Sequence, residues 1–387
     1  MSEALSKSPE VAAARAEEAG AEGLVAADAR WVRENPSIEV EYGTDAVTQD
    51  QGERRLSVAI SQQLQVAGQR GLRVERAEAA LAAARARRRA VELSVAREVA
   101  DAAAEWVRRQ AHVRLAENVL TAARALEEAA ARRFAAGDVP ELERNAAALE
   151  RARAEARAAQ ARAEAAGALA SMNRRLGRPV SAPLELTLEP VAVSLEEVRA
   201  ELPELEAARA DAEAARVEVD LLRRERIPDP TVSLGYEEEK RLEEHITGPD
   251  LHTASMVVAR LSVPLPLWNR NQGELAAARA RRAAREAERE GREREVEAER
   301  LSARESYEAA RTAETALTAA LPGVERNLSL VQRAYEAGEL SLDALLLARD
   351  RAYAARGEAI DAAAALARAR AAFLRVSGRL PTGEAPR

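Results

Sequence analysis

Histidines and carboxylates are the main side chains here that could hold a metal ion or act as a general base, because the 387 residues include no cysteine. Disulfides, thiolate metal sites and thiol catalysis are therefore excluded. Of the three histidines, His112 lies in a helix-forming run, whereas His245 lies among the acids of residues 237–251 and His252 directly follows them. Imidazole and carboxylate groups suit divalent cations. This segment could bind a metal transiently, although a solvated loop is the favoured interpretation.

Catalytic and nucleic-acid-binding motifs are missing. No glycine-rich phosphate loop follows a strand pattern, and no nucleophile–base motif stands out. We therefore predict no enzyme, no catalytic residue, no cofactor and no resident metal site. Arginine-rich runs at residues 85–89 and 279–282 could indicate nucleic-acid binding. A charged helix surface is favoured over a nucleic-acid partner, because the net charge is −7 and the chain has only 3 Trp, 5 Tyr and 2 Phe.

The composition is typical of long helices packed through small residues. Hydrophobic residues make up 47% of the chain and charged residues 32%, but aromatic residues only 3%. No apolar run reaches the length of about 18 residues that a transmembrane helix needs. A membrane β-barrel is not excluded by this, since its strands alternate. The N-terminal residues, MSEALSKSPE, carry no secretory signal, so we expect either a cytoplasmic protein or a trimmed form.

The two halves of the sequence repeat one another. Residues 9–16 (PEVAAARA) match residues 203–210 (PELEAARA) 194 positions later (203 − 9 = 194). Further on, residues 134–137 match residues 335–338 at an offset of 201 (335 − 134 = 201). Matches that keep their order along nearly half the chain predict two copies of one structural unit. We place these units at residues 1–193 and 194–387.

Each unit is predicted to contain the same elements in the same order. In the first we expect a helix at about 8–33, strands at about 36–43 and 55–65, a long helix at about 68–136, a tip at 137–140, a returning helix at about 141–176 and a linker marked by Gly177, Pro179, Pro183 and Pro190. In the second we expect a helix at about 202–226, strands at about 230–237 and 255–266, a long helix at about 271–336, a tip at 338–343 and a returning helix to about 377. At 1.5 Å per residue, the first long helix would measure roughly 100 Å.

The strand patterns alternate between apolar and polar residues. Ile38, Val40 and Tyr42 fall on one face, and Glu39 and Glu41 on the other. The second repeat places Val232, Leu234 and Tyr236 opposite Glu237 in the same way. This pattern is typical of a membrane barrel wall, whose polar face points toward a lumen. The three acids on the polar face are therefore predicted to face the lumen.

Four strands are too few to close a channel, so we expect several chains to share one barrel. Trp31 precedes the first strand and Trp268 follows the fourth. Both are predicted to lie at a membrane interface, where aromatic side chains gather.

The run at residues 262–274 (SVPLPLWNRNQGE) carries a resemblance to a known family. It is similar to the strand-to-helix junction of TolC-like outer-membrane efflux proteins, in the cobalt–zinc–cadmium (CzcC-like) heavy-metal branch. Residues 60–71 (ISQQLQVAGQRG) are similar to the matching junction of the first repeat. The resemblance covers essentially the whole chain.

The resemblance implies a mainly helical protein with a small β part, in the outer membrane and periplasm. It implies a homotrimer in which each chain gives four strands to a 12-stranded transmembrane β-barrel, while the helices form a long periplasmic barrel. The implied partners are outer-membrane lipid, a periplasmic adaptor (membrane fusion) protein and an inner-membrane RND-type pump. Relatives are exported, so a trimmed signal is expected. Many also carry an N-terminal lipidated cysteine, which this sequence lacks.

The resemblance also assigns site residues at the two tips. Adaptor docking is implied for Gly137, Asp138, Val139, Pro140, Gly338, Glu339, Leu340 and Ser341. Relatives often carry constriction acids six and nine residues after the second tip glycine, but Ala344 and Leu347 stand there in this chain. The candidate acids are instead Glu141, Glu143 and Asp343, with Glu339 nearby. Asp138 or Ser341 could cap a returning helix.

The resemblance to the heavy-metal branch implies a passive exit duct for divalent heavy-metal cations. The cation would be bound weakly, because conduction requires release. A drug or protein export duct of the same fold is one alternative interpretation. A soluble coiled-coil scaffold is the other, although it does not explain alternating strands at the same place in both repeats.

Overall fold

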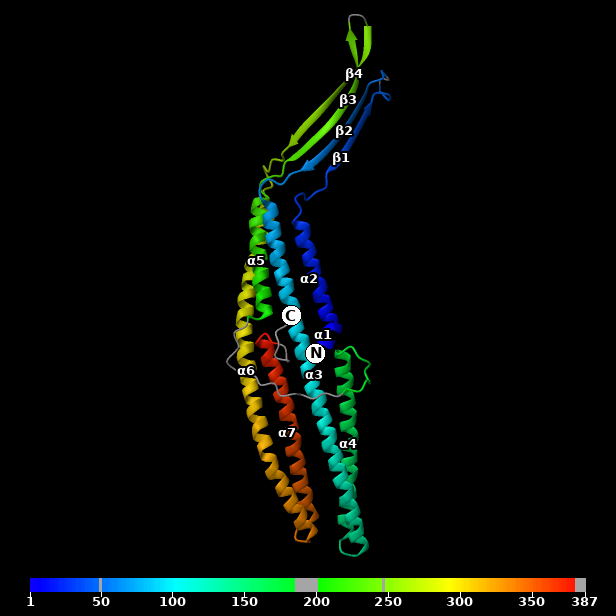
Figure 1. Ribbon diagram of the computed structural model, residues 1–387, viewed down its shortest axis with the longest axis vertical. Helices are drawn as coiled ribbons and strands as arrows, with labels where there is room; N and C mark the ends of the chain where they lie inside the picture. Colours follow the sequence, from blue (N-terminus) through cyan, green and yellow to red (C-terminus); the bar gives the residue numbers. More distant parts are fainter. Residues whose placement is uncertain (49–50, 185–200, 246–247, 380–387) are drawn as a thin grey trace. The chain divides into compact units, whose positions relative to one another are not determined.

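A computed structural model describes residues 1–48, 51–184, 201–245 and 248–379. Within these residues the chain forms seven helices and one four-stranded sheet (Figure 1). The predicted boundary between the repeats, at residues 193 and 194, lies outside the described residues, as does Pro190.

The chain divides into two compact units that each draw on both repeats. The helical unit comprises Met1–Ala16, Ala86–Glu206 and Arg292–Arg387. The sheet unit comprises Glu17–Arg85 and Ala207–Gly291. Because the repeats interleave in this way, neither repeat is a compact body by itself.

The long helices agree with the sequence prediction. The helices are α1 (Ser2–Lys7), α2 (Pro9–Asp28), α3 (Gln69–Ala135), α4 (Glu141–Arg175), α5 (Pro203–Arg224), α6 (Gln272–Glu336) and α7 (Leu342–Val376). The helix expected at about 8–33 is shorter in the structure, where α2 ends at Asp28. Arg70 donates from Nε and Nη2 to the carbonyl oxygen of Ala29 at 2.9 and 2.7 Å. A side chain distant in sequence therefore satisfies this carbonyl in place of another helical turn.

The sheet is antiparallel and its strands lie in sequence order, β1 (Ser37–Thr44), β2 (Arg54–Gln63), β3 (Thr231–His245) and β4 (Gly248–Ser262). One row of paired residues runs from Val40 through Val58 and Tyr236 to Val257. The predicted alternation is therefore confirmed across the sheet. The apolar face of β1 is uncovered, with Ile38 70% exposed.

The prediction of a loop at residues 237–251 is wrong. β3 continues to His245 and β4 begins at Gly248, so these residues extend the second hairpin. Its acid-rich composition favoured a solvated loop, but ladder hydrogen bonds join backbone groups and tolerate exposed charges on either face. Pairing continues through Glu239 with Ala254 and Arg241 with His252.

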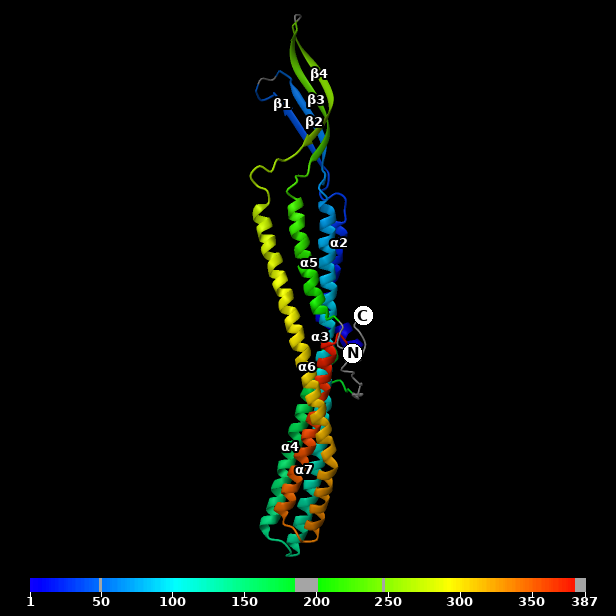
Figure 2. The same cartoon turned by 90° about the vertical axis from the view of Figure 1, so that its left-hand side faces the viewer.

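Small residues form much of the core of the helical unit. Val119 and Ala123 of α3 pack with Ala154 and Ala158 of α4. Between α6 and α7, the rings of Tyr307 and Phe373 stack with centroids 5.7 Å apart. The turns joining α3 to α4 and α6 to α7 lie at the same end of the helical unit (Figures 1 and 2). Close packing through alanine was the expectation from composition.

Away from the tips, contacts within the helical unit put α3 and α7 between α4 and α6. Asp361 of α7 accepts from Arg108 Nη1 of α3 at 2.9 Å and lies 2.8 Å from Nε2 of His112. Figure 1 shows the same order, with α4 and α6 outermost.

Candidate functional site: the hairpin tips and the polar face of the sheet

Both tips use the same turn geometry. The backbone N–H of Gly137 donates to Phe134 O at 3.0 Å and that of Asp138 to Arg133 O at 2.9 Å. In the second tip Gly338 donates to Tyr335 O at 3.0 Å and Glu339 to Ala334 O at 2.8 Å. This paired pattern is the Schellman motif, which needs a left-handed residue after the helix. Gly137 and Gly338 have φ of +80° and +77°, as that motif requires.

The two returning helices begin differently. Ser341 is the N-cap of α7, and its Oγ accepts from the N–H of Ala344 at 3.4 Å. The N-cap of α4 is Pro140, which makes no side-chain cap. Asp138 therefore does not cap α4, because it lies two residues before the cap position.

The residues predicted to dock an adaptor are mostly accessible. Val139 is buried, whereas the other seven are exposed: Gly137, Asp138, Pro140, Gly338, Glu339, Leu340 and Ser341. Beneath the turns lies a small apolar core of Leu126, Ala130, Ala147, Tyr335, Leu342 and Leu345. The tips thus present polar and backbone groups on a packed base.

A polar contact joins the two hairpins just behind the tips. Tyr335 Oη of α6 donates to Glu143 Oε1 of α4 at 2.7 Å. Arg133 lies 3.9 Å from the same oxygen, and its guanidinium carbon is 5.5 Å from the Tyr335 ring centre. Burial, followed by the hydrogen bond to Glu143, raises the pKa of Tyr335. In the sequence Tyr335 stands out only as part of the repeated segment 335–338, so this contact was not predicted.

The acids proposed for a constriction are not equivalent. Glu143 is engaged by Tyr335, and Glu141 Oε1 accepts from Arg144 Nη2 at 2.7 Å. Asp138, Glu339 and Asp343 are exposed, and within the described residues no ion pair or side-chain hydrogen bond engages their carboxylates. These three acids are therefore the ones whose charge is left uncompensated at the tips.

Three acids predicted to face a lumen share one face of the sheet, but their surroundings differ. Register places Glu41 opposite Ser57, and Ser57 opposite Glu237. Glu237 accepts from Arg55 Nη2 at 3.2 Å and from Arg260 Nη2, and its side chain is only 12% exposed. Two arginines therefore outweigh its charge. Glu39 and Glu41 are exposed and have no ion-pair partner among the described residues.

Both predicted interface tryptophans lie in connections between helix and strand. Trp31 follows α2 and is 82% exposed, and Trp268 follows β4 and is 85% exposed. The Arg70 guanidinium carbon lies 5.0 Å from the centre of the Trp31 ring. Their location agrees with the sequence, while their role at a membrane interface stays a prediction.

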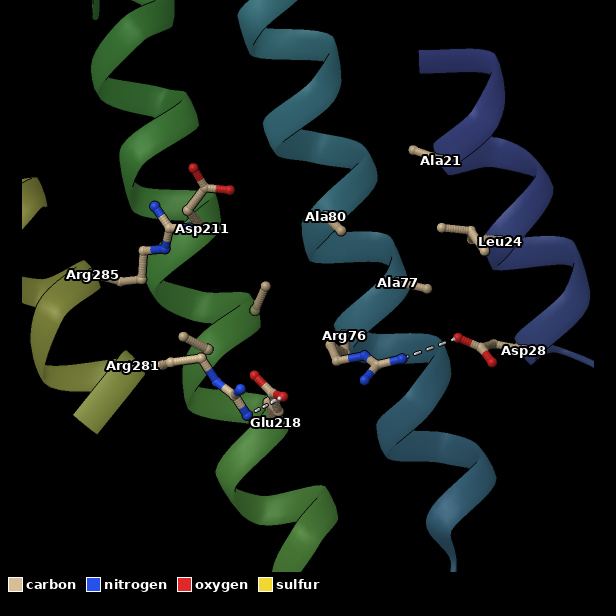
Figure 3. Close-up of a pocket in the computed structure, with 12 residues that line it drawn as sticks. Ala21, Leu24, Asp28, Arg76, Ala77, Ala80, Asp211, Glu218, Arg281 and Arg285 are labelled. Carbon is tan, nitrogen blue, oxygen red and sulfur yellow. Dashed lines mark hydrogen bonds and ion pairs between the residues drawn. The ribbon is translucent and has the colours of Figure 1, made fainter. Parts of the chain in front are cut away.

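The sheet unit also contains a cavity of about 380 Å³ lined by α2, α3, α5 and α6 (Figure 3). Four of its charged side chains form pairs across the lining: Arg76 with Asp28 at 3.7 Å and Arg281 with Glu218 at 3.0 Å. Alanines form much of the remaining wall. Among the described residues, no group of three or more His, Asp or Glu could hold a metal ion.

Within the part of the chain that the structure describes, no helix has the length and apolar character needed to cross a membrane.

Comparisons with known proteins identify the family. The family model "Outer membrane efflux protein" matches residues 1–178 and 194–379. A search of curated proteins gives no match.

Solved outer-membrane channels share the fold. The outer membrane protein VceC of Vibrio cholerae is 21% identical with a TM-score of 0.78, covering 98% of this chain and 95% of that chain. The open state of the MtrE channel of Neisseria gonorrhoeae is 19% identical with a TM-score of 0.78, covering 100% and 89%. The CmeC channel of Campylobacter jejuni is 14% identical with a TM-score of 0.75, covering 97% and 84%. The chain belongs to the outer membrane efflux protein family, whose members are channels rather than enzymes.

Proposed function

We propose that this outer membrane efflux protein is the exit duct of a tripartite efflux system and works as a homotrimer. Its sheet would lie in outer-membrane lipid and its helical unit in the periplasm. There the tips would dock a periplasmic adaptor protein that leads to an inner-membrane RND-type pump. The observation that carries this proposal is the four-stranded sheet, which has one uncovered apolar face and one polar face.

The two outer strands of the sheet favour closure by further copies. β1 and β4 each pair on one side only within the described chain. Unpaired strand edges cannot be left in a bilayer, because no water is available to hydrogen-bond them. The even number of strands lets β4 of one copy run antiparallel to β1 of the next, and three copies make 12 strands. Glu39 and Glu41 on β1 and Arg260 on β4 bring opposite charges to this junction.

We propose divalent transition-metal cations as the cargo, conducted passively. The resemblance of residues 262–274 to the heavy-metal branch motivates this choice. The exposed carboxylates of Asp138, Glu339 and Asp343 support it, because uncompensated acids at an entrance raise the local cation concentration. A duct also needs weak, reversible contacts with its cargo.

Two measurements test the duct and its cargo separately. The purified protein should form a trimer in detergent and give conductance steps in a planar bilayer; a non-conducting monomer would overturn the duct. Deletion of the gene should raise sensitivity to zinc, cobalt or cadmium and leave sensitivity to bulky hydrophobic drugs unchanged. Drug sensitivity with normal metal tolerance would replace the proposed cargo and leave the duct standing.

A further inference from the structure

Two basic residues stand directly opposite each other on the apolar face of the sheet. Register pairs Arg54 of β2 with Lys240 of β3. Because side chains alternate along a strand, both belong to the same face as Val58 and Tyr236. Like charges that stand directly opposite each other destabilise a pair of strands. A bound anion would remove this repulsion, so the pair is a candidate anion site.

The pair differs from the arginines on the polar face of the sheet. Those three arginines have acid partners within the chain: Arg55 and Arg260 with Glu237, and Arg241 with Glu239. In contrast, neither Arg54 nor Lys240 forms an ion pair or a side-chain hydrogen bond with any described residue. Arg54 is exposed and Lys240 is half-buried. The positive charge of the pair is therefore not offset by a direct partner.

The acid nearest the pair on this face is Glu238. It lies two residues along β3 from Lys240, and its Oε2 accepts from Tyr236 Oη at 3.4 Å. No ion pair joins Glu238 to Arg54 or Lys240 within the described residues. This part of the face thus carries two bases and one acid, and the excess positive charge favours an anionic ligand.

A cavity of about 310 Å³ lies beside the pair. Arg54 and Lys240 both line it, and Thr44 and Thr48 add hydrogen-bonding groups. The acids in the lining are engaged by other groups: Glu239 by Arg241, Glu53 by the N–H of Leu242 and Asp45 by the N–H of Gln51. Ligand sites in proteins begin at roughly 300 Å³. The space is therefore enough for the head group of a small amphipathic ligand.

The pair lies at the end of the apolar face that is farther from α3. The row of this face nearest α3 contains Gln62, and Arg54 is eight residues away along β2 (62 − 54 = 8). Eight residues of strand span roughly 26 Å, or roughly 20 Å across a membrane when strands tilt by about 40°. The apolar band of a membrane barrel is about 25 Å tall. In the proposed duct the two bases are therefore expected near the outer edge of the band, at the level of the lipid head groups.

We propose that Arg54 and Lys240 bind the phosphate group of a lipid in the outer leaflet. The head group would occupy the neighbouring cavity, and the acyl chains would lie along the apolar rows that contain Leu56 and Val58. A lipid is favoured over free phosphate because the apolar face continues directly from the pair. The inference rests on the proposed outer-membrane duct and adds one specific lipid site for each chain.

Native mass spectrometry of the full-length trimer in detergent tests the site. The probe is lipid A with two phosphate groups, and the comparison is the same glycolipid after removal of both phosphates. The phosphorylated lipid should bind in a ratio of one to each chain, and the dephosphorylated lipid should bind more weakly. In the double variant Arg54→Gln with Lys240→Gln, affinity for the phosphorylated lipid should fall roughly 25-fold, because each basic side chain near a membrane surface contributes a factor of about five.

Two further double variants serve as controls. Arg114→Gln with Arg157→Gln removes the same charge from exposed side chains of the helical unit that pair with no described residue, and it should leave the affinity unchanged. Arg54→Lys with Lys240→Arg keeps both charges and should keep the affinity within about twofold. The neutral variant of the pair should keep its strand content in circular dichroism, because it removes two opposed like charges.

Each outcome decides between the lipid site and its alternatives. Equal affinity of the unaltered protein and the Arg54 and Lys240 variant would overturn the site. An equal loss in the Arg114 and Arg157 variant would also overturn it, because that result indicates general charge attraction.

The lipids themselves supply the remaining outcomes. Equal binding of the dephosphorylated lipid would contradict recognition of phosphate, and inorganic phosphate that competes as strongly as the lipid would contradict a lipid site. If the trimer forms but binds no phosphorylated lipid, the site alone fails. If the unaltered protein forms no trimer, the proposed function itself fails.

Discussion

The hydrogen bond between Tyr335 and Glu143 predicts how firmly the two hairpin tips are held together. Tyr335→Phe removes the hydroxyl that donates to Glu143 at 2.7 Å and keeps the ring that packs in the tip core. A hydrogen bond to a charged group contributes about 1.5–3 kcal/mol. Because the Glu143 side chain is 19% exposed and can be partly solvated when released, we expect the lower end of that range. This corresponds to a roughly tenfold rise in the population of separated tips.

Hydrogen exchange at the tip amides measures this population. The amides of Gly137 and Glu339 hold the two turns, and in Tyr335→Phe their segments should exchange roughly tenfold faster. Tyr307→Phe is the matched control: Tyr307 is buried on the same helix, and no hydrogen bond engages its hydroxyl within the described residues. Its tip exchange should equal that of the unaltered protein. The reasoning is refuted if both variants exchange alike at the tips.

Three further predictions concern the tips and the sheet. In Gly338→Ala the new Cβ meets open space, but the residue has to adopt φ +77°. The turn should therefore lose about 1 kcal/mol of stability, and adaptor affinity should fall while the trimer stays intact. The control Gly167→Ala lies in a helix where the new Cβ also meets open space, and it should leave adaptor affinity unchanged. Glu237→Gln leaves two arginines without their acid, and the bilayer reversal potential at low salt should shift toward anions; an unchanged potential would contradict a lumenal position. Burial and the hydrogen bond to Glu143 raise the pKa of the Tyr335 hydroxyl above its ordinary value of 10.0. The hydroxyl should therefore stabilise the tips fully below about pH 10 and lose this effect as the pH rises through the raised pKa. Hydrogen-exchange rates of the tip amides, measured at several pH values, check this.

Local periodicity was enough to predict most of the fold. The ends of α4 and α6 and the faces of β1 follow from spacing and from glycine and proline positions, which depend on neighbours in sequence. The second hairpin was underestimated because residues 237–245 are rich in charge, and only their pairing with β4 makes them a strand. The end of α2 was misplaced because Arg70, from the start of another helix, satisfies its carbonyl.

The chemistry of the candidate sites could be predicted only in part, because it depends on contacts between distant residues. The sequence correctly put Glu39, Glu41 and Glu237 on one face. It could not show that Glu237 is held by Arg55, which is 182 residues away, or that Glu143 accepts from Tyr335, which is 192 residues away.

The repeat also explains why the second pair of equivalent tip positions, which lies within the described residues, has no contact of this kind. At the offset of 201, Tyr335 corresponds to Phe134 and Glu143 to Ala344. The equivalent pair has neither a hydroxyl nor a carboxylate, so no hydrogen bond of this kind can form there. The two hairpin turns share one geometry, but only the pair Tyr335 and Glu143 has the side chains for this hydrogen bond.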